Sequence, residues 1–423
     1  MILGVVKLNK RFKIYFICLS IFCFTVALMR SINMGITCDE AITYLTYINK
    51  NWLLNLQLIA NNHLLNTILI QIIVSVTKIK YNEFILRIPN LIIYLIYLYY
   101  SYKISTKLYK NSYSLATVLL LNYSVNEFAS VARGYGMASS FVLAALYYYK
   151  LYIKSNDSKQ FKLAVYSLLL ACFSNTICLI ISFIFIADFL IRSIKNKSLK
   201  KFIIQNQVFT ILSYFFFLIF FFYHIFVYLN DKFINYAYCS KDIFSCLIYS
   251  KFNYYGLGFI NKYIVGVLFL LFVILLIISV SKKYKRDNLF YMSFALYFVL
   301  MILKYVLKFN FPTGRTMIPV FSIYIISLFD GIYLIFGEKS KYLVAIIMIF
   351  PFISFFKNLN IYYIREWKDD YYLKNRVEKV LKQRKKINPK TVPKISKPTL
   401  NYYYSKYKDK YSYNILSDVI YED

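Results

Sequence analysis

The chain has 423 residues, of which 60% are hydrophobic and 20% aromatic, and its formal net charge at pH 7 is +32. A mean hydropathy of +0.53 excludes an ordinary soluble domain. The basic residues lie mostly in loops between apolar runs and in the last segment, 357–423, as the positive-inside rule predicts for a membrane protein. We therefore attribute the charge to membrane topology and expect no nucleic-acid partner.

Apolar runs of membrane-spanning length recur along the chain and predict an all-α polytopic membrane protein with about eleven transmembrane helices. The runs are 13–30, 64–77, 84–104, 113–125, 136–153, 161–190, 205–229, 263–281, 288–304, 316–336 and 342–356. The run 161–190 is long enough for a hairpin, and its CFSN stretch is a candidate break. We count it as one crossing, because the basic loops then agree on orientation.

The orientation follows from those basic loops. The basic N-terminal segment 7–13 and the loops 192–201 and 282–286 are expected on the cytoplasmic side of the membrane. Three segments are then expected outside the membrane on its outer face: 31–62, 230–262 and 357–423. We divide the chain into a multi-pass domain, 1–356, and a small C-terminal tail.

The tail 357–423 opens with REWKDDYYLKNRVEKVLKQRKK, in which Trp367, Tyr371, Val377 and Leu381 recur at roughly helical spacing. The stretch INPKTVPKISKP should end that helix, and an aromatic NYYYSKY stretch follows it. We interpret the tail as a small extracytoplasmic α/β cap without chemistry of its own.

Polar residues gather at the predicted outer surface. The stretch GITCDEAITYL (35–45) follows the first apolar run and contains the acid pair Asp39 and Glu40. That pair belongs either to a solvated loop or to a catalytic site. Asn62 and His63 precede the second apolar run at the same surface. Because Asn is a common N-cap residue, they either cap a helix or form the polar floor of a site beside the acid pair.

Two further stretches place charges near the membrane. Glu127 and Arg133 interrupt an apolar region, where charges are costly and usually face a cavity or each other. The alternative is a short loop between two crossings. Arg315 lies between Pro312 and Pro319 at the outer end of a crossing, where an Arg either binds phosphate oxygens or extends its head group to the interface.

The order of four motifs carries a resemblance. The acid pair, the Asn-His pair, RIPNLI (87–92) and ARGYGM (132–137) follow one another within about the first 140 residues. In order and spacing they resemble the GT-C glycosyltransferases, and within them the branch of the protein mannosyltransferases and the lipid A aminoarabinose transferases. The prolines of that branch's second motif and the upstream Ser-Arg of its last motif are absent here.

The resemblance implies that a sugar passes from a polyprenyl-phosphate donor to an acceptor hydroxyl of a lipid, a glycan or a protein, outside the cell membrane. Asp39 matches the catalytic Asp of the family, and a carboxylate can take the acceptor's proton. Glu40 is expected to orient the acceptor or to help hold a metal. His63 matches the family's His and is a second candidate ligand for a divalent ion, which is the only cofactor left open.

Donor binding is assigned to the basic and amide side chains. Arg315 is expected to stabilise the leaving phosphate, and Asn62 to line the site. Arg133 matches a family motif, but the crossing count places it toward the inner side. The rival class is a transporter or a flippase of lipid-linked glycans, which would also bury charges near the membrane. Transporters often consist of two similar halves, and the sequence shows no such pair.

Overall fold

The computed structural model describes residues 10–48, 63–110, 112–195, 199–207, 289–306, 314–337, 351–382 and 397–411, with a few separate residues between these ranges. The described chain is helical apart from one two-residue pairing, in which β1 (Tyr238–Cys239) runs antiparallel to β2 (Phe311–Pro312). The long helices are α1 (Lys10–Asn33), α4 (Glu83–Lys103), α7 (Gly134–Ser155), α8 (Ser158–Ser174), α9 (Cys178–Lys195), α14 (Phe290–Tyr305), α15 (Ile318–Phe336), α17 (Lys368–Lys382) and α18 (Lys397–Tyr411). The prediction of an all-helical protein is confirmed for these residues.

Shorter helices complete the described chain. They are α2 (Cys38–Ile42), α3 (Leu64–Thr77), α5 (Tyr113–Leu120), α6 (Tyr123–Ala129) and α10 (Leu199–Gln205), with single turns or π-helical stretches at η1 (Thr43–Ile48), η3 (Ile104–Leu108), η6 (Gly314–Met317) and η8 (Arg365–Trp367). Side-chain caps explain several starts. Asn82 accepts a hydrogen bond from the backbone N–H of Ile85 at the start of α4, and Asn122 does the same for Val125 at α6.

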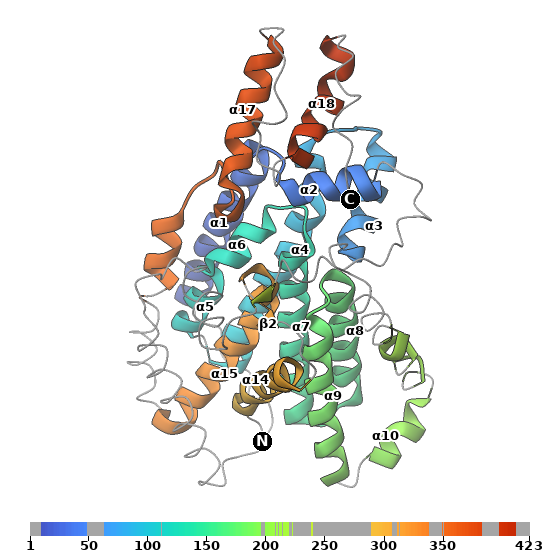
Figure 1. Ribbon diagram of the computed structural model, residues 1–423. Helices are drawn as coiled ribbons and strands as arrows, with labels where there is room; N and C mark the ends of the chain where they lie inside the picture. Colours follow the sequence, from blue (N-terminus) through green and yellow to red (C-terminus); the bar gives the residue numbers. More distant parts are fainter. Residues whose placement is uncertain are drawn as a thin grey trace.

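The helix α7 is the centre of the bundle and packs against α4, α8 and α15. In Figure 1, α2, α17 and α18 lie at one end, which we call the upper end, and α9 ends at the opposite, lower end. Both α7 and α15 begin toward the upper end. Further down they are joined by an ion pair between Lys150 and Asp330, which fixes one helix against the other along their length.

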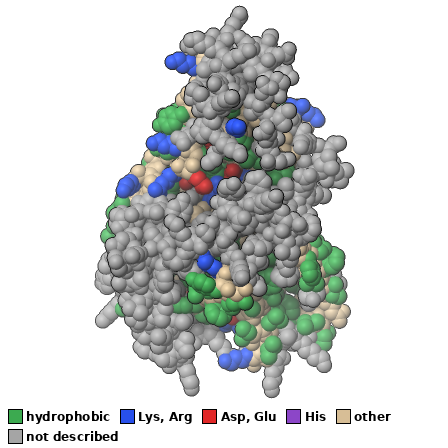
Figure 2. Space-filling model, viewed as in Figure 1, with side chains coloured by type: hydrophobic (Ala, Val, Ile, Leu, Met, Phe, Trp, Pro, Cys, Tyr) green, Lys and Arg blue, Asp and Glu red, His purple; other side chains and the backbone are tan. Residues whose placement is uncertain are grey.

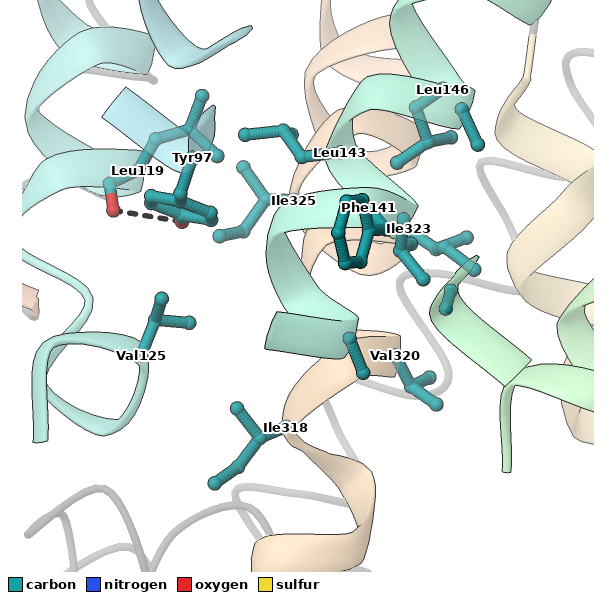
Figure 3. Close-up of a cluster of buried hydrophobic side chains, with 14 of the residues drawn as sticks. Tyr97, Leu119, Val125, Phe141, Leu143, Leu146, Ile318, Val320, Ile323 and Ile325 are labelled. Carbon is teal, nitrogen blue, oxygen red and sulfur yellow. Dashed lines mark hydrogen bonds between the residues drawn. The ribbon is translucent and has the colours of Figure 1, made fainter. Parts of the chain in front are cut away.

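A continuous apolar core fills the space between these helices. Tyr97 from α4, Leu143 from α7 and Ile325 from α15 point into it (Figure 3). The Tyr97 hydroxyl donates a hydrogen bond of 3.0 Å to the carbonyl of Leu119 in α5, so the ring is buried without an unsatisfied polar group.

Three helices in the described chain are long and apolar enough to span a membrane: Lys10–Asn33, Glu83–Leu108 and Gly314–Tyr333. The prediction of about eleven such helices is therefore wrong for the described residues. The other apolar runs there form helices that are shorter or more polar. The helix α9, for example, carries Asp188, Arg192 and Lys195. The runs 205–229, 263–281 and 342–356 lie wholly or partly outside the described residues.

Two of the expected crossings differ in the structure. The run 64–77 forms α3, which stays at the upper end: His63 bonds to Ser174, and beyond the helix Tyr81 contacts Tyr402 of α18. The run 161–190 forms two antiparallel helices, α8 and α9, which separate at Asn175. These two errors compensate each other, so the basic end of α9, with Arg192 and Lys195, still lies at the lower end.

The run 113–125 joins the two ends of the bundle, as expected, but in the opposite direction, because α3 does not cross. It forms α5 and α6, which rise from the lower end, where Tyr113 contacts Phe12, to the upper end, where Asn126 contacts Arg30. Residues after α6 are therefore at the upper end, and not at the lower end as the crossing count predicted. The β component of the predicted α/β cap is also wrong for the described tail, where a helical turn and two helices account for all the regular structure in 365–382 and 397–411.

Candidate functional site

The short helix α2 carries the acid pair and is fixed by its second acid. Thr37 and Glu40 form a capping box: the Glu40 N–H donates to the Thr37 hydroxyl at 3.3 Å, and the Thr37 N–H donates to Oε2 of Glu40 at 2.9 Å. Glu40 also accepts from Arg87, at 2.8 Å on Oε1 and 2.6 Å on Oε2. Both side chains are buried, so this is a buried two-point ion pair.

Arg87 uses its remaining donors on backbone carbonyls. They contact Ser31 at 3.0 Å, Met34 at 2.7 Å and Gly35 at 2.7 Å, all at the end of α1. These carbonyls have no partner within a helix that ends there, and the guanidinium replaces that partner. Arg87 thus fixes the direction in which the chain leaves α1 for α2.

Glu40 links this arrangement to α7. Its Oε1 also accepts a hydrogen bond of 2.7 Å from the backbone N–H of Ala132, the residue before Arg133. Each carboxylate oxygen of Glu40 therefore accepts two hydrogen bonds. Its position is that of a residue that holds α2 and the Arg133 segment together, and not of one that faces a ligand.

Asp39 lies between two arginines. Its Oδ2 is 3.3 Å from Nη2 of Arg133 and 3.1 Å from Nη2 of Arg315. The Asp39 side chain is 10% exposed, Arg133 is fully buried, and Arg315 is 19% exposed. Arg133 also donates to the Thr43 hydroxyl at 3.1 Å, which fixes its guanidinium beside α2.

Arg315 is held on several sides. Its Nη1 contacts Oε1 of Glu366 at 2.8 Å, and its guanidinium lies over the ring of Trp367, 4.8 Å from the centroid. The Tyr135 ring is 5.9 Å from the guanidinium carbons of both Arg133 and Arg315. Glu366, from the tail, is the most exposed charged group of the set, with 35% of its side chain accessible.

His63 lies next to the same tyrosine. The two rings meet edge to face at 4.6 Å, and Nδ1 of His63 is 2.8 Å from the carbonyl of Ser174. Burial lowers the pKa of His63 well below its ordinary value, and the charges of Arg133 and Arg315 lower it further. His63 is therefore neutral, and Nδ1 must donate to Ser174, because a carbonyl can only accept.

The tail supports this region directly. The backbone N–H of Cys38 donates to Oδ2 of Asp370 at 2.7 Å, and that of Ile36 donates to the hydroxyl of Tyr403 at 2.9 Å. Lys406 pairs with Glu83 at the start of α4. The turn before α2 is thus held by α17 and α18, so the tail does more than form the cap that the sequence predicted.

The structure brings together Asp39, Glu40, His63, Arg133 and Arg315 of the predicted site residues, and Asn62 lies outside the described residues. The placement of Arg133 on the inner side was wrong, because α3 does not cross and α5 and α6 therefore bring the chain to the upper end, where Arg133 contacts Asp39. Glu127 does not contact Arg133. It accepts instead from the hydroxyl of Tyr123 at 2.7 Å and from the backbone N–H of Arg365 at 2.8 Å.

Sequence reasoning missed Arg87, Tyr135 and Asp370. The motif RIPNLI contained Arg87, and its position inside an apolar run was the signal that it needed a buried partner. No group of three or more His, Cys, Asp or Glu side chains in the described chain is arranged to hold a metal ion. Glu40 and His63, the two candidate ligands, are held by Arg87 and Ser174 respectively.

Acidic and basic side chains also meet at the molecular surface below the C-terminal helices (Figure 2).

No family model, no curated protein and no solved structure matches this chain. The site must therefore be judged by its chemistry: one carboxylate and one neutral imidazole beside two guanidinium groups, at one end of an apolar helical bundle.

Proposed function

We propose that this protein is a multi-pass glycosyltransferase of the cell membrane, which moves a sugar from a polyprenyl-phosphate donor to an acceptor hydroxyl on the outer side. The observation that carries the proposal is the position of Asp39 between Arg133 and Arg315. Guanidinium groups bind phosphate oxygens well, and an adjacent carboxylate can accept a proton. Both requirements of the transfer are met within one cluster of side chains.

The roles follow from this geometry. The isoprenoid chain stays among the apolar helices, so its phosphate and sugar stop at the end of the bundle. Arg133 and Arg315 stabilise the charge that develops on the leaving phosphate. Asp39 takes the proton of the acceptor hydroxyl as it attacks the anomeric carbon, while the bond to the phosphate oxygen breaks.

Glu366 marks the entry of the donor. It occupies Nη1 of Arg315, whereas Asp39 faces Nη2. An arriving phosphate can replace this partly exposed carboxylate at lower cost than it can replace the buried Asp39, because Glu366 regains water when it is released. The anion site therefore opens toward the tail.

The test is transfer of labelled sugar from a polyprenyl-phosphate donor by membranes that contain each variant at matched expression. Asp39→Asn should lower the rate about 100-fold or more, the scale for removal of a general base. Asp157→Asn removes a carboxylate from the exposed loop before α8 and should leave the rate unchanged. Full activity of Asp39→Asn would overturn the proposal. Movement of the intact lipid-linked sugar across the membrane without transfer would instead favour a flippase.

A further inference from the structure

One ring nitrogen of His63 has no protein partner. His63 is 6% exposed, its Nδ1 donates to the carbonyl of Ser174, and its Nε2 is buried without a hydrogen bond. The tautomer that Ser174 requires leaves a lone pair on Nε2. Nε2 is therefore a buried hydrogen-bond acceptor with nothing to accept from.

Such a group is costly in a folded protein. A buried polar atom without a partner loses its hydrogen bonds to water and gains none in return, which is why nearly all such atoms are satisfied in native structures. A second buried acceptor, Oδ2 of Asp39, also lacks a hydrogen bond, although it lies at ion-pair distance from two arginines. The two arginines compensate the charge of Asp39, whereas Nε2 of His63 has no donor at all, which indicates that a ligand supplies it.

The neighbours of His63 narrow the class of that ligand. Tyr135 contacts the His63 ring on one side and lies near both Arg133 and Arg315. A ligand that satisfies all of these groups needs an anionic part for the guanidinium groups and hydroxyl donors for His63 and Asp39. A phosphate ester of a sugar has both, whereas a bare lipid phosphate lacks the hydroxyl groups.

We infer that Nε2 of His63 accepts a hydrogen bond from a sugar hydroxyl of the donor, so that the site distinguishes a sugar-bearing lipid phosphate from the bare lipid phosphate. This inference rests on the proposed function and adds to it the residue that recognises the sugar. His63 stays neutral in the site and acts as an acceptor, and not as a cation or a metal ligand.

Two substitutions of His63 distinguish the role of Nδ1 from that of Nε2. Asn places its amide near the position of Nδ1, so His63→Asn keeps a donor for Ser174 and removes the acceptor at the Nε2 position. Gln reaches the position of Nε2, so His63→Gln keeps an acceptor there. The matched pair therefore changes sugar recognition while leaving the charge of the site unchanged.

The experiment measures binding of purified protein to a polyprenyl phosphate and to the same lipid carrying mannose, glucose or arabinose. The wild type should bind at least one sugar-bearing lipid more tightly than the bare lipid. His63→Asn should lose about tenfold in affinity for that lipid and keep its affinity for the bare one, and His63→Gln should lose less.

Undiminished preference of His63→Asn for the sugar-bearing lipid would overturn the inference. Equal binding of all the lipids by the wild type would also overturn it, while leaving the phosphate site of the proposed function intact. Failure of the wild type to bind any of them would overturn the proposed function itself. Thermal unfolding of each variant without lipid checks that the fold is retained.

Discussion

Glu40 and Arg87 form a buried ion pair of 2.8 and 2.6 Å that connects α2 to α4, 47 positions apart in the chain. The pair is fully hydrogen-bonded on both sides, since Glu40 also accepts from two backbone N–H groups and Arg87 donates to three carbonyls. A buried pair of this kind gives little net stability, but removal of one partner leaves an uncompensated charge. Its role is to fix α2, so that the neighbouring Asp39 meets the arginines.

We therefore predict that Glu40→Gln acts on stability. The substitution leaves Arg87 charged and buried, so it should lower the free energy of unfolding by about 3–5 kcal/mol. Thermal unfolding in detergent measures the effect. Glu83→Gln is the matched control, because the pair of Glu83 with Lys406 is more exposed. Its loss should be clearly smaller, and equal losses in the two variants would contradict the structural role.

A second prediction follows from the close contact of α7 with α8. A Cβ at Gly134 would lie 1.9 Å from the carbonyl of Ser174 and 2.8 Å from His63. Gly134→Ala must therefore separate the helices or displace His63, at a cost of several kcal/mol. Gly337→Ala is the control: its Cβ meets nothing within 4 Å, and its φ of +51° should cost only about 1–2 kcal/mol. Thermal unfolding that ranks the two variants in the reverse order would show that this packing is not required.

The sequence predicted correctly those features that depend on the chemistry of single residues and their near neighbours in the chain. The apolar runs predicted a helical membrane protein, and the polar and charged residues within or beside them identified Asp39, His63, Arg133 and Arg315, which the structure brings together. The reason is that burial of a charge near a membrane needs a partner or a function, and this requirement is visible residue by residue.

The contacts between segments that are distant in the chain could not be predicted from the sequence in this way. Hydropathy reports the length of an apolar run, but not whether its helix crosses the bundle or turns back within it. The helix α3 has an apolar composition, and yet Asn66 bonds to the carbonyl of Ala132 and holds the helix at the upper end. Contacts such as that of Asp370 with Cys38 join residues more than 300 positions apart, and no local pattern encodes them.

The corrected path of the chain gives a third prediction. Lys80, after α3, should lie on the same side of the membrane as Asp39, and Asp157, between α7 and α8, on the opposite side. A single Cys at either position, in a protein whose native cysteines are replaced, tests this with a membrane-impermeant maleimide. We expect labelling of position 80 from outside and protection of position 157. Protection of position 80 would restore α3 as a crossing.

Arg315 provides a fourth prediction. Its planar guanidinium contacts Asp39 and Glu366 through different nitrogens and lies over the ring of Trp367, and a Lys ammonium cannot reproduce this arrangement. Arg315→Lys should therefore weaken binding of a polyprenyl phosphate and lower sugar transfer severalfold or more. Arg11→Lys makes the same change at the lower end and should have no effect. Unchanged binding by Arg315→Lys would remove this residue from the anion site.

The pKa of His63 gives the last prediction, which concerns stability and pH. In the unfolded chain His63 titrates near its ordinary value of about 6.5, whereas in the fold burial and the two arginines hold its pKa well below that value. Above pH 6.5 the imidazole is neutral in both states and adds no pH dependence. As the pH falls below 6.5, the unfolded state binds the proton first. The free energy of unfolding should then decrease by up to about 1.4 kcal/mol per pH unit.

Thermal unfolding of the wild type and of His63→Asn between pH 7.5 and 5 checks this, since every other titrating group is common to both proteins. The melting temperature of the wild type should fall more steeply below pH 6.5, so that its value minus that of His63→Asn decreases toward pH 5. Parallel curves would mean that the folded protein also accepts a proton at His63. The imidazole would then be accessible to water, and Nε2 would no longer be a buried acceptor.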